Sequence, residues 1–159
     1  MNKKMQEDPI IALFGHMGLE VNLLELSDED RTELQKAIAL HKQFRPLIHS
    51  GHLQRLETPD YATSSGIVSP DKSCALFSYA LTRCHTSQLP KRLQFQGLDP
   101  NQIYQLDCIW PINASSSTPS ILDSAKACLV SGAALMEHGM QMPLILPETL
   151  LLFSLTQHS

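Results

Sequence analysis

Residues 74–82 read CALFSYALT, a run in which apolar side chains fill both alternating sets of positions. A strand with one face in water alternates apolar and polar residues, whereas a strand that is apolar on both sides is buried on both. We therefore expect residues 74–82 to form a central strand of a sheet.

Short segments of similar character lie on both sides of this run. Residues 92–96 and 103–110 alternate apolar with polar side chains, and Pro or Gly residues separate the segments from one another. Short strands at such spacing are typical of antiparallel sandwiches. The sequence thus predicts a mainly β domain, an antiparallel β-sandwich of Greek-key type, with one helical turn within residues 131–139. The remaining strand candidates are residues 52–56, 66–70, 144–146 and 149–155.

The N-terminal part follows a different pattern. Residues 10–14 (IIALF) form a continuous apolar run that predicts a buried strand. Ser27, followed by three acidic residues, marks a helix start, and apolar residues then recur at helical spacing. Pro46 should kink or end this helix near residues 44–45. One strand and one helix cannot bury their own faces, so we expect residues 1–51 to belong to a larger α/β structure and residues 52–159 to form the sandwich.

Composition excludes two classes of partner. Net charge is −4, and the twelve Lys and Arg residues are scattered rather than gathered on one basic face. A nucleic-acid binder needs such a face to displace counterions from phosphates. The longest apolar stretch, residues 144–155, is too short and too interrupted to span a bilayer. We expect neither nucleic-acid nor membrane binding.

The four cysteines indicate a reducing compartment. Cys74, Cys84, Cys108 and Cys128 form no C-x-x-C pair and have no zinc-type spacing. The N-terminal residues lack the apolar core of a signal peptide. We expect free thiols in a cytoplasmic protein.

No motif in the sequence carries catalysis, a cofactor or a metal ion. The acidic residues 28–30 stand at the helix start, where they compensate the helix dipole, and Asp71 and Asp99 are expected to form turns. Two residues near the apolar run are candidates to face a pocket. They are His16, between two glycines, and Glu20, which alternatively forms a buried salt bridge.

Three aromatic residues leave a binding function open. Trp110, Tyr61 and Tyr104 could provide a stacking platform for a sugar, although we favour core packing because aromatic residues are only 6% of the chain.

Several segments, in order along the chain, carry a family resemblance. They are residues 14–20 (FGHMGLE), 26–29 (LSDE), 45–51 (RPLIHSG), 93–100 (LQFQGLDP), 131–136 (SGAALM) and 139–143 (GMQMP). Together they resemble the C-terminal end of bacterial α-galactosidases of glycoside hydrolase family 36, enzymes that act on terminal α-galactosides such as melibiose or raffinose. The resemblance covers residues 10–157.

The resemblance implies a layout. Residues 10–50 would be the last strand and helix of a (β/α)8 barrel, and residues 52–157 the C-terminal β-sandwich. The family's retaining mechanism uses two aspartates in barrel segments that precede the matched region, and no residue here corresponds to either. We therefore expect a C-terminal piece of an α-galactosidase, structural in role and inert alone, whose partner is the barrel or a second copy.

Two alternatives remain at this point. One is a free-standing carbohydrate-binding sandwich with an α-galactoside as its ligand. The other is a piece that completes a barrel supplied by another chain.

Overall fold

The computed structural model describes residues 26–84, 89–110 and 128–158. The chain divides into two compact units, Met1–His49 and Ser50–Ser159. Each is described by itself. The strand expected at residues 10–14 lies outside the described residues.

The first unit contains helix α2 (Asp28–Ser50). Its start is the one predicted, directly after Ser27. Of the two outcomes predicted for Pro46, an end of the helix near residues 44–45 is wrong, because residues 47–50 continue the helical path. A proline removes its own backbone donor and no other, and this loss falls close to the helix end, where the chain turns at Gly51.

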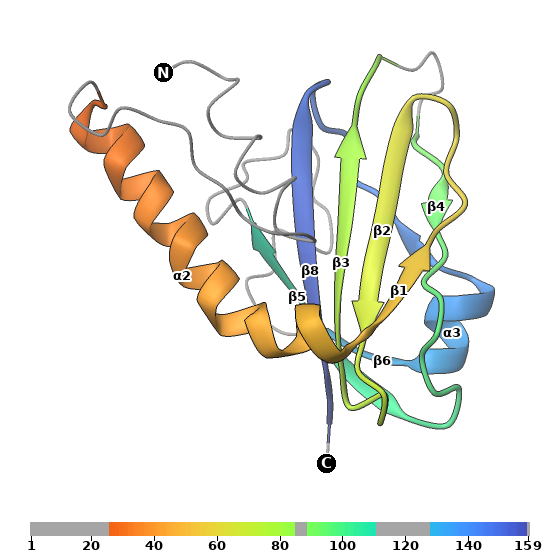
Figure 1. The fold of residues 1–159 in the computed structure, drawn as a ribbon. Coiled ribbons are helices and arrows are strands. Elements are labelled where there is room, and N and C mark those ends of the chain that lie inside the picture. Colours follow the sequence, from red (N-terminus) through yellow and green to blue (C-terminus); the bar gives the residue numbers. More distant parts are fainter. Residues whose placement is uncertain (1–25, 85–88, 111–127, 159) are drawn as a thin grey trace. The chain divides into compact units, whose positions relative to one another are not determined.

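The second unit is built on a six-stranded antiparallel sheet, the main sheet (Figure 1). β3 (Cys74–Leu81) lies between β2 and β8, which confirms the central strand expected there. In spatial order the strands are β1 (His52–Arg55), β2 (Ala62–Val68), β3, β8 (Thr149–Gln157), β5 (Ile103–Trp110) and β6 (Cys128–Ser131).

A smaller second layer packs on one side of the main sheet, which we call the inner face. The layer consists of β4 (Arg92–Leu93), which pairs with β7 (Met140–Gln141), and helix α3 (Gly132–Glu137). α3 and β4 lie on the same side of the sheet in Figure 1. A mainly antiparallel β domain is thus confirmed.

Three phenylalanines hold the two layers together. The Phe77 and Phe95 rings meet edge to face with centroids 4.9 Å apart, and Phe95 meets Phe153 in the same manner at 6.3 Å. All three side chains are fully buried. They join β3 and β8 to the second layer, and edge-to-face pairs add stability beyond the area they bury.

The structure differs from the predicted strands at several places. β2 covers Ala62–Val68, whereas the strand was predicted at residues 66–70. Residues 94–96 are not a strand, although Phe95 is buried and Gln94 and Gln96 are exposed, as their alternation predicted. Residues 144–146 form no strand, because Pro143 and Pro147 on either side cannot donate to a ladder. The short strands β6 and β7 were not predicted at all.

Among the described residues, no helix is both long enough and apolar enough to cross a membrane.

Candidate functional site

The two residues predicted to face a pocket, His16 and Glu20, lie outside the described residues. Within the described ranges no cluster of three or more His, Cys, Asp or Glu side chains could hold a metal ion. A candidate site must therefore be sought among the surfaces and polar contacts of the described part.

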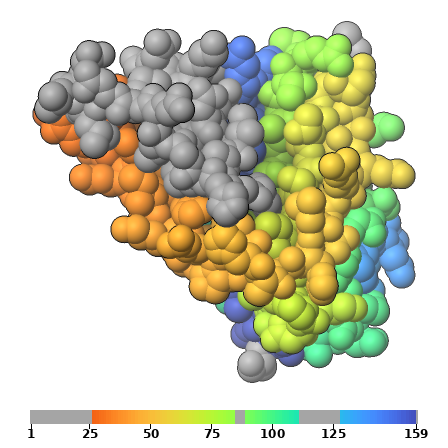
Figure 2. Space-filling model, viewed as in Figure 1, coloured from red at the N-terminus to blue at the C-terminus, as the bar shows by residue number. Residues whose placement is uncertain are grey.

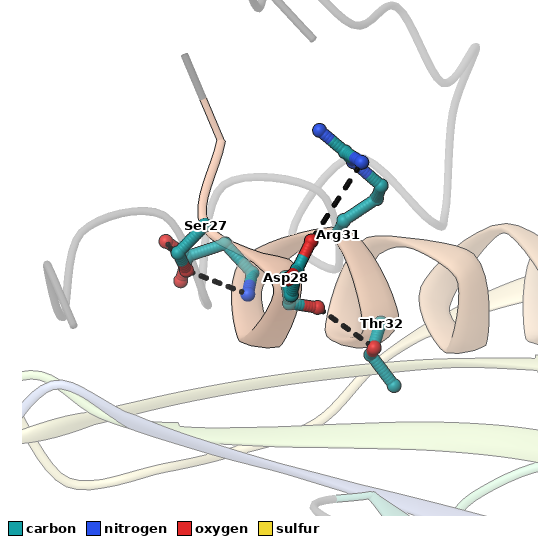
Figure 3. Close-up of polar contacts among 5 residues, drawn as sticks. Ser27, Asp28, Arg31 and Thr32 are labelled. Atoms are coloured by element: carbon teal, nitrogen blue, oxygen red, sulfur yellow. Dashed lines mark hydrogen bonds and ion pairs between the residues drawn. The ribbon is translucent and has the colours of Figure 1, made fainter. Parts of the chain in front are cut away.

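The acidic residues at the start of α2 have a structural role (Figure 3). The Asp30 backbone N–H donates to Ser27 Oγ at 3.1 Å, and that hydroxyl donates to Asp30 Oδ2 at 2.7 Å. Arg31 lies 3.7 Å from Asp28. Ser27 thus caps the helix, and the Asp30 carboxylate holds the capping hydroxyl in place.

Asp71 organises the turn between β2 and β3. Its Oδ1 accepts hydrogen bonds from the Ser69 hydroxyl at 2.6 Å and from the Ser73 backbone and hydroxyl at 3.1 and 2.8 Å. These bonds favour the charged form and lower the pKa of the Asp71 carboxyl to about 2, the Ser69 bond contributing most. The prediction that Asp71 is a turn residue is confirmed.

The aromatic residues do not form a sugar-binding platform. Tyr104 is 0% exposed and Trp110 is 5% exposed. The Tyr104 hydroxyl donates to the Lys72 carbonyl at 2.8 Å and accepts from the Asp99 N–H at 3.0 Å. Tyr61 packs partly buried against the core. Tyr104 and Trp110 are therefore core residues with no face open to a ligand, and Tyr61 alone is not a platform.

All four cysteines are free thiols. Burial raises the pKa of Cys108 to about 11, against a smaller opposing effect of the Trp110 backbone, so this thiol is neutral at physiological pH. Cys84 is exposed. A thiol that stays protonated is a poor nucleophile, which argues against Cys108 as a catalytic group.

A groove of about 610 Å³ opens beside α3, between β6 and β7. Its floor includes Leu106 and Val130. At its rim, the Arg92 guanidinium donates to the Gly139 carbonyl at 3.2 Å, and the Gln141 amide donates to the Pro90 carbonyl at 2.7 Å. These rim donors bind the protein's own backbone, and much of the remaining lining is hydrocarbon.

The side of the main sheet opposite the second layer, the outer face, combines apolar residues with polar ones such as Ser78 and Ser154. Along β3 and β8 the residues that do not point to the inner face include Leu76 and Leu152, both 0% exposed. Ile67, Leu150 and Trp110 occupy the same face, at 3%, 7% and 5% exposure. None of these five belongs to the core cluster that the second layer covers.

Three exposed apolar side chains surround this outer face, and we call them the outer-face rim. Leu53 on β1 pairs with Ile67 and is 58% exposed. Ile103 on β5 and Leu129 on β6 are 49% and 52% exposed. β1 and β2 lie at the molecular surface in Figure 2. The exposed apolar surface of this face is therefore the rim, because the residues at its centre are shielded from solvent within the chain.

Sequence reasoning anticipated part of this surface. The two-sided apolar pattern of residues 74–82 predicted a central strand, and Leu76 on the outer side of that strand is buried. The rim was missed, because single apolar residues on short edge strands carry no local signal that separates an interface from ordinary surface.

Comparison with known proteins shows which family the described domain resembles. The model of the glycosyl hydrolase family 36 C-terminal domain matches residues 62–150. An α-galactosidase of Escherichia coli is 32% identical over 154 residues, which is 92% of this chain and 22% of that protein. AgaA, an α-galactosidase of Geobacillus stearothermophilus, is 27% identical over 99 residues, 61% of this chain and 14% of AgaA.

Solved structures agree with the fold. The α-galactosidase of Lactobacillus brevis superposes with a TM-score of 0.76 at 25% identity, and AgaA of Geobacillus stearothermophilus with 0.75 at 23%. In each case the match covers 94% of this chain and 19% of the other. The chain spans about a fifth of the length of these relatives.

Proposed function

Because this chain belongs to the glycosyl hydrolase family 36 C-terminal domain family, we propose that it is the accessory C-terminal part of an α-galactosidase. In this role it supports the catalytic barrel and supplies no catalytic group. The parent enzyme would act on terminal α-galactosides such as melibiose or raffinose, the substrates expected from the resemblance.

The family match and the share of its relatives that this chain spans carry this proposal. The centre of the outer face is shielded from solvent within the chain, because Leu76 and Leu152 are 0% exposed. The apolar side chains still exposed on this face are those of the rim. Since the relatives are about five times longer than this chain, the catalytic barrel of the same enzyme is the partner we assign to the rim.

The rim extends the same surface. Leu53, Ile103 and Leu129 are each about half exposed and lie on the outer face by strand register. Exposed leucines and isoleucines gathered around a buried apolar centre are typical of a surface that packs against another part of a protein.

Retaining glycosidases need two carboxyl groups about 5 to 5.5 Å apart across the scissile bond. The acidic residues resolved above have other roles, Asp30 in a helix cap and Asp71 in a turn. We therefore propose that the chain alone does not hydrolyse galactosides. The test is turnover of p-nitrophenyl α-galactoside by purified chain, and a rate above the protein-free blank that survives further purification would overturn the proposal.

A chimera tests the supporting role directly. The corresponding C-terminal part of the Escherichia coli α-galactosidase would be replaced by this chain, and activity and thermal inactivation measured. We expect an active chimera. Ile103→Asp together with Leu129→Asp should lower its activity or its inactivation temperature, because two carboxylates would be buried without partners.

Leu146→Asp is the matched control. Leu146 is 73% exposed and lies in the connection between β7 and β8, away from the outer face. The same chemical change there should leave the chimera unaltered. If the rim variant behaves like this control, the outer face is not the surface that meets the barrel.

Two further features belong to the same proposal. Residues 1–51 would be the last strand and helix of the barrel, followed by the sandwich at residues 52–159. The enzyme would be cytoplasmic, in keeping with four free thiols.

A further inference from the structure

The last strand of the chain occupies the centre of the main sheet. β8 pairs with β3 from Cys74↔Thr156 to Leu81↔Thr149, and on its other edge it pairs with β5. In the described sheet β3 and β5 are joined only through β8. Without β8, a slot remains between the β1–β2–β3 part and the β5–β6 part.

The slot is specific for a strand that is apolar on both sides. Leu151, Phe153 and Leu155 of β8 fill the inner face at 0 to 1% exposure, while Leu150 and Leu152 fill the outer face. The sequence of β8 satisfies every position of this slot. A second copy of the chain carries the same strand and can satisfy the slot equally well.

The connection that leads into β8 is strained. Residues 142–148 contain Pro143 and Pro147, and Glu148 adopts φ +60°, a left-handed conformation that L side chains rarely take. The Glu148 N–H donates to the Leu81 carbonyl at 2.7 Å, which holds the chain in this conformation at the start of β8. Strained connections of this kind favour exchange of the element that follows them.

We propose that two copies of this chain exchange β8, so that the β8 of each copy lies between the β3 and β5 of the other. Each exchanged sheet has the strand pairs and buried side chains of the closed form. The two forms differ in the connection, where an extended path releases the left-handed Glu148, and in the entropy of association, which makes the exchange dependent on concentration.

A pair of residues on β3 and β8 distinguishes exchange from a surface dimer. Cys74 stands directly opposite Thr156, and opposed residues have Cβ atoms about 4.5–5.5 Å apart, close enough for a disulfide with small adjustment. One copy would carry Thr156→Cys with Cys74→Ser, and the other would keep both native residues. The exposed Cys84 would be replaced by Ser in both copies.

The two full-length copies would be mixed in denaturant, refolded over about a hundredfold range of concentration and oxidised. We expect a dimer fraction that rises with concentration, and a disulfide that joins Cys74 of one copy to the introduced thiol of the other, identified by peptide mass mapping. Two results would overturn the proposal. One is a monomer at every concentration. The other is a dimer in which this disulfide is no more abundant than after refolding each copy alone.

Variants of the connection test its cause. Glu148→Gly removes the steric penalty of the left-handed conformation, an effect of about fivefold on the closed form of each copy. With two copies, the dimer should dissociate about 25-fold more readily. Glu148→Ala is the matched control. It deletes the same carboxylate but keeps the penalty, and it should dimerise as the unchanged chain does. Equal effects of both variants would show that strain at Glu148 does not drive the exchange.

Discussion

Gly66→Ala should destabilise the main sheet because no space exists for a methyl group at this position. Gly66 lies opposite Phe77 across β2 and β3. A Cβ added at Gly66 would stand 2.0 Å from Phe77 Cδ1 and 2.3 Å from Cε1. The ring would have to move, and it is packed edge to face on Phe95 at 4.9 Å.

The magnitude follows from three contributions to the free energy of unfolding. Overpacking of a core costs about 1–3 kcal/mol, and disturbing the aromatic pair costs up to about 1 kcal/mol more. Alanine recovers about 0.5–1 kcal/mol relative to glycine within a strand. The net loss is about 2 kcal/mol, which lowers the urea midpoint by about 1 M for an m-value of about 2 kcal/mol/M.

The assay is urea unfolding followed by tryptophan fluorescence, because the single Trp110 lies in β5 of the same sheet. Thr63→Ala, at an exposed position of the same strand, should change stability by less than about 0.5 kcal/mol. Combining Gly66→Ala with Phe77→Leu should cost less than the sum of the two single changes. A Gly66→Ala midpoint like that of Thr63→Ala would refute the reasoning from ring contact.

Three further outcomes are expected. Tyr104→Phe should lose about 1–3 kcal/mol in the same urea assay, because the Lys72 carbonyl and a backbone amide lose their buried hydroxyl partner. For Asp71, the carboxylate is favoured in the folded state, with its pKa lowered to about 2 from 3.8. The stability difference between the unchanged chain and Asp71→Ala should therefore be constant above about pH 4 and shrink as pH falls from about 4 to 2, as followed by thermal unfolding. Cys108, whose burial raises its pKa to about 11, should react with iodoacetamide far more slowly than Cys84 in the folded chain at pH 8, as measured by mass spectrometry.

Local patterns predicted the elements whose own residues determine them. β5 has the predicted bounds, 103–110, because its alternation is clear and a turn at residues 97–100 precedes it. The start of α2 follows from Ser27 and Asp30. The two-residue strands β4 and β7 exist through pairing with each other, and a two-residue segment has no period to detect.

Non-local pairing explains most of what the sequence did not reveal. Residues 144–146 are as apolar as a strand, yet they form a connection. Two prolines flank the segment, and Glu148 after it has a left-handed conformation. Trp110 and Tyr104 could be read as exposed aromatics until the pairing of β5 with β8 placed both in buried positions. Sequence alone does not say which strands become neighbours, and the neighbours decide burial.

The central strands β3 and β8 are buried on both faces of the main sheet. Strands buried on both faces must lie inside a sheet, and in this chain β3 and β8 are adjacent there. Their inner residues meet the second layer through Phe77 and Phe153, whereas their outer residues, Leu76 and Leu152, are equally apolar. Both outer side chains are 0% exposed, and Ser78 and Ser154 share their face by strand register, so the centre of this face is shielded from solvent within the chain. The exposed hydrocarbon of this face lies at its edges, on Leu53, Ile103 and Leu129, which is why the substitutions that test the proposed function are placed there.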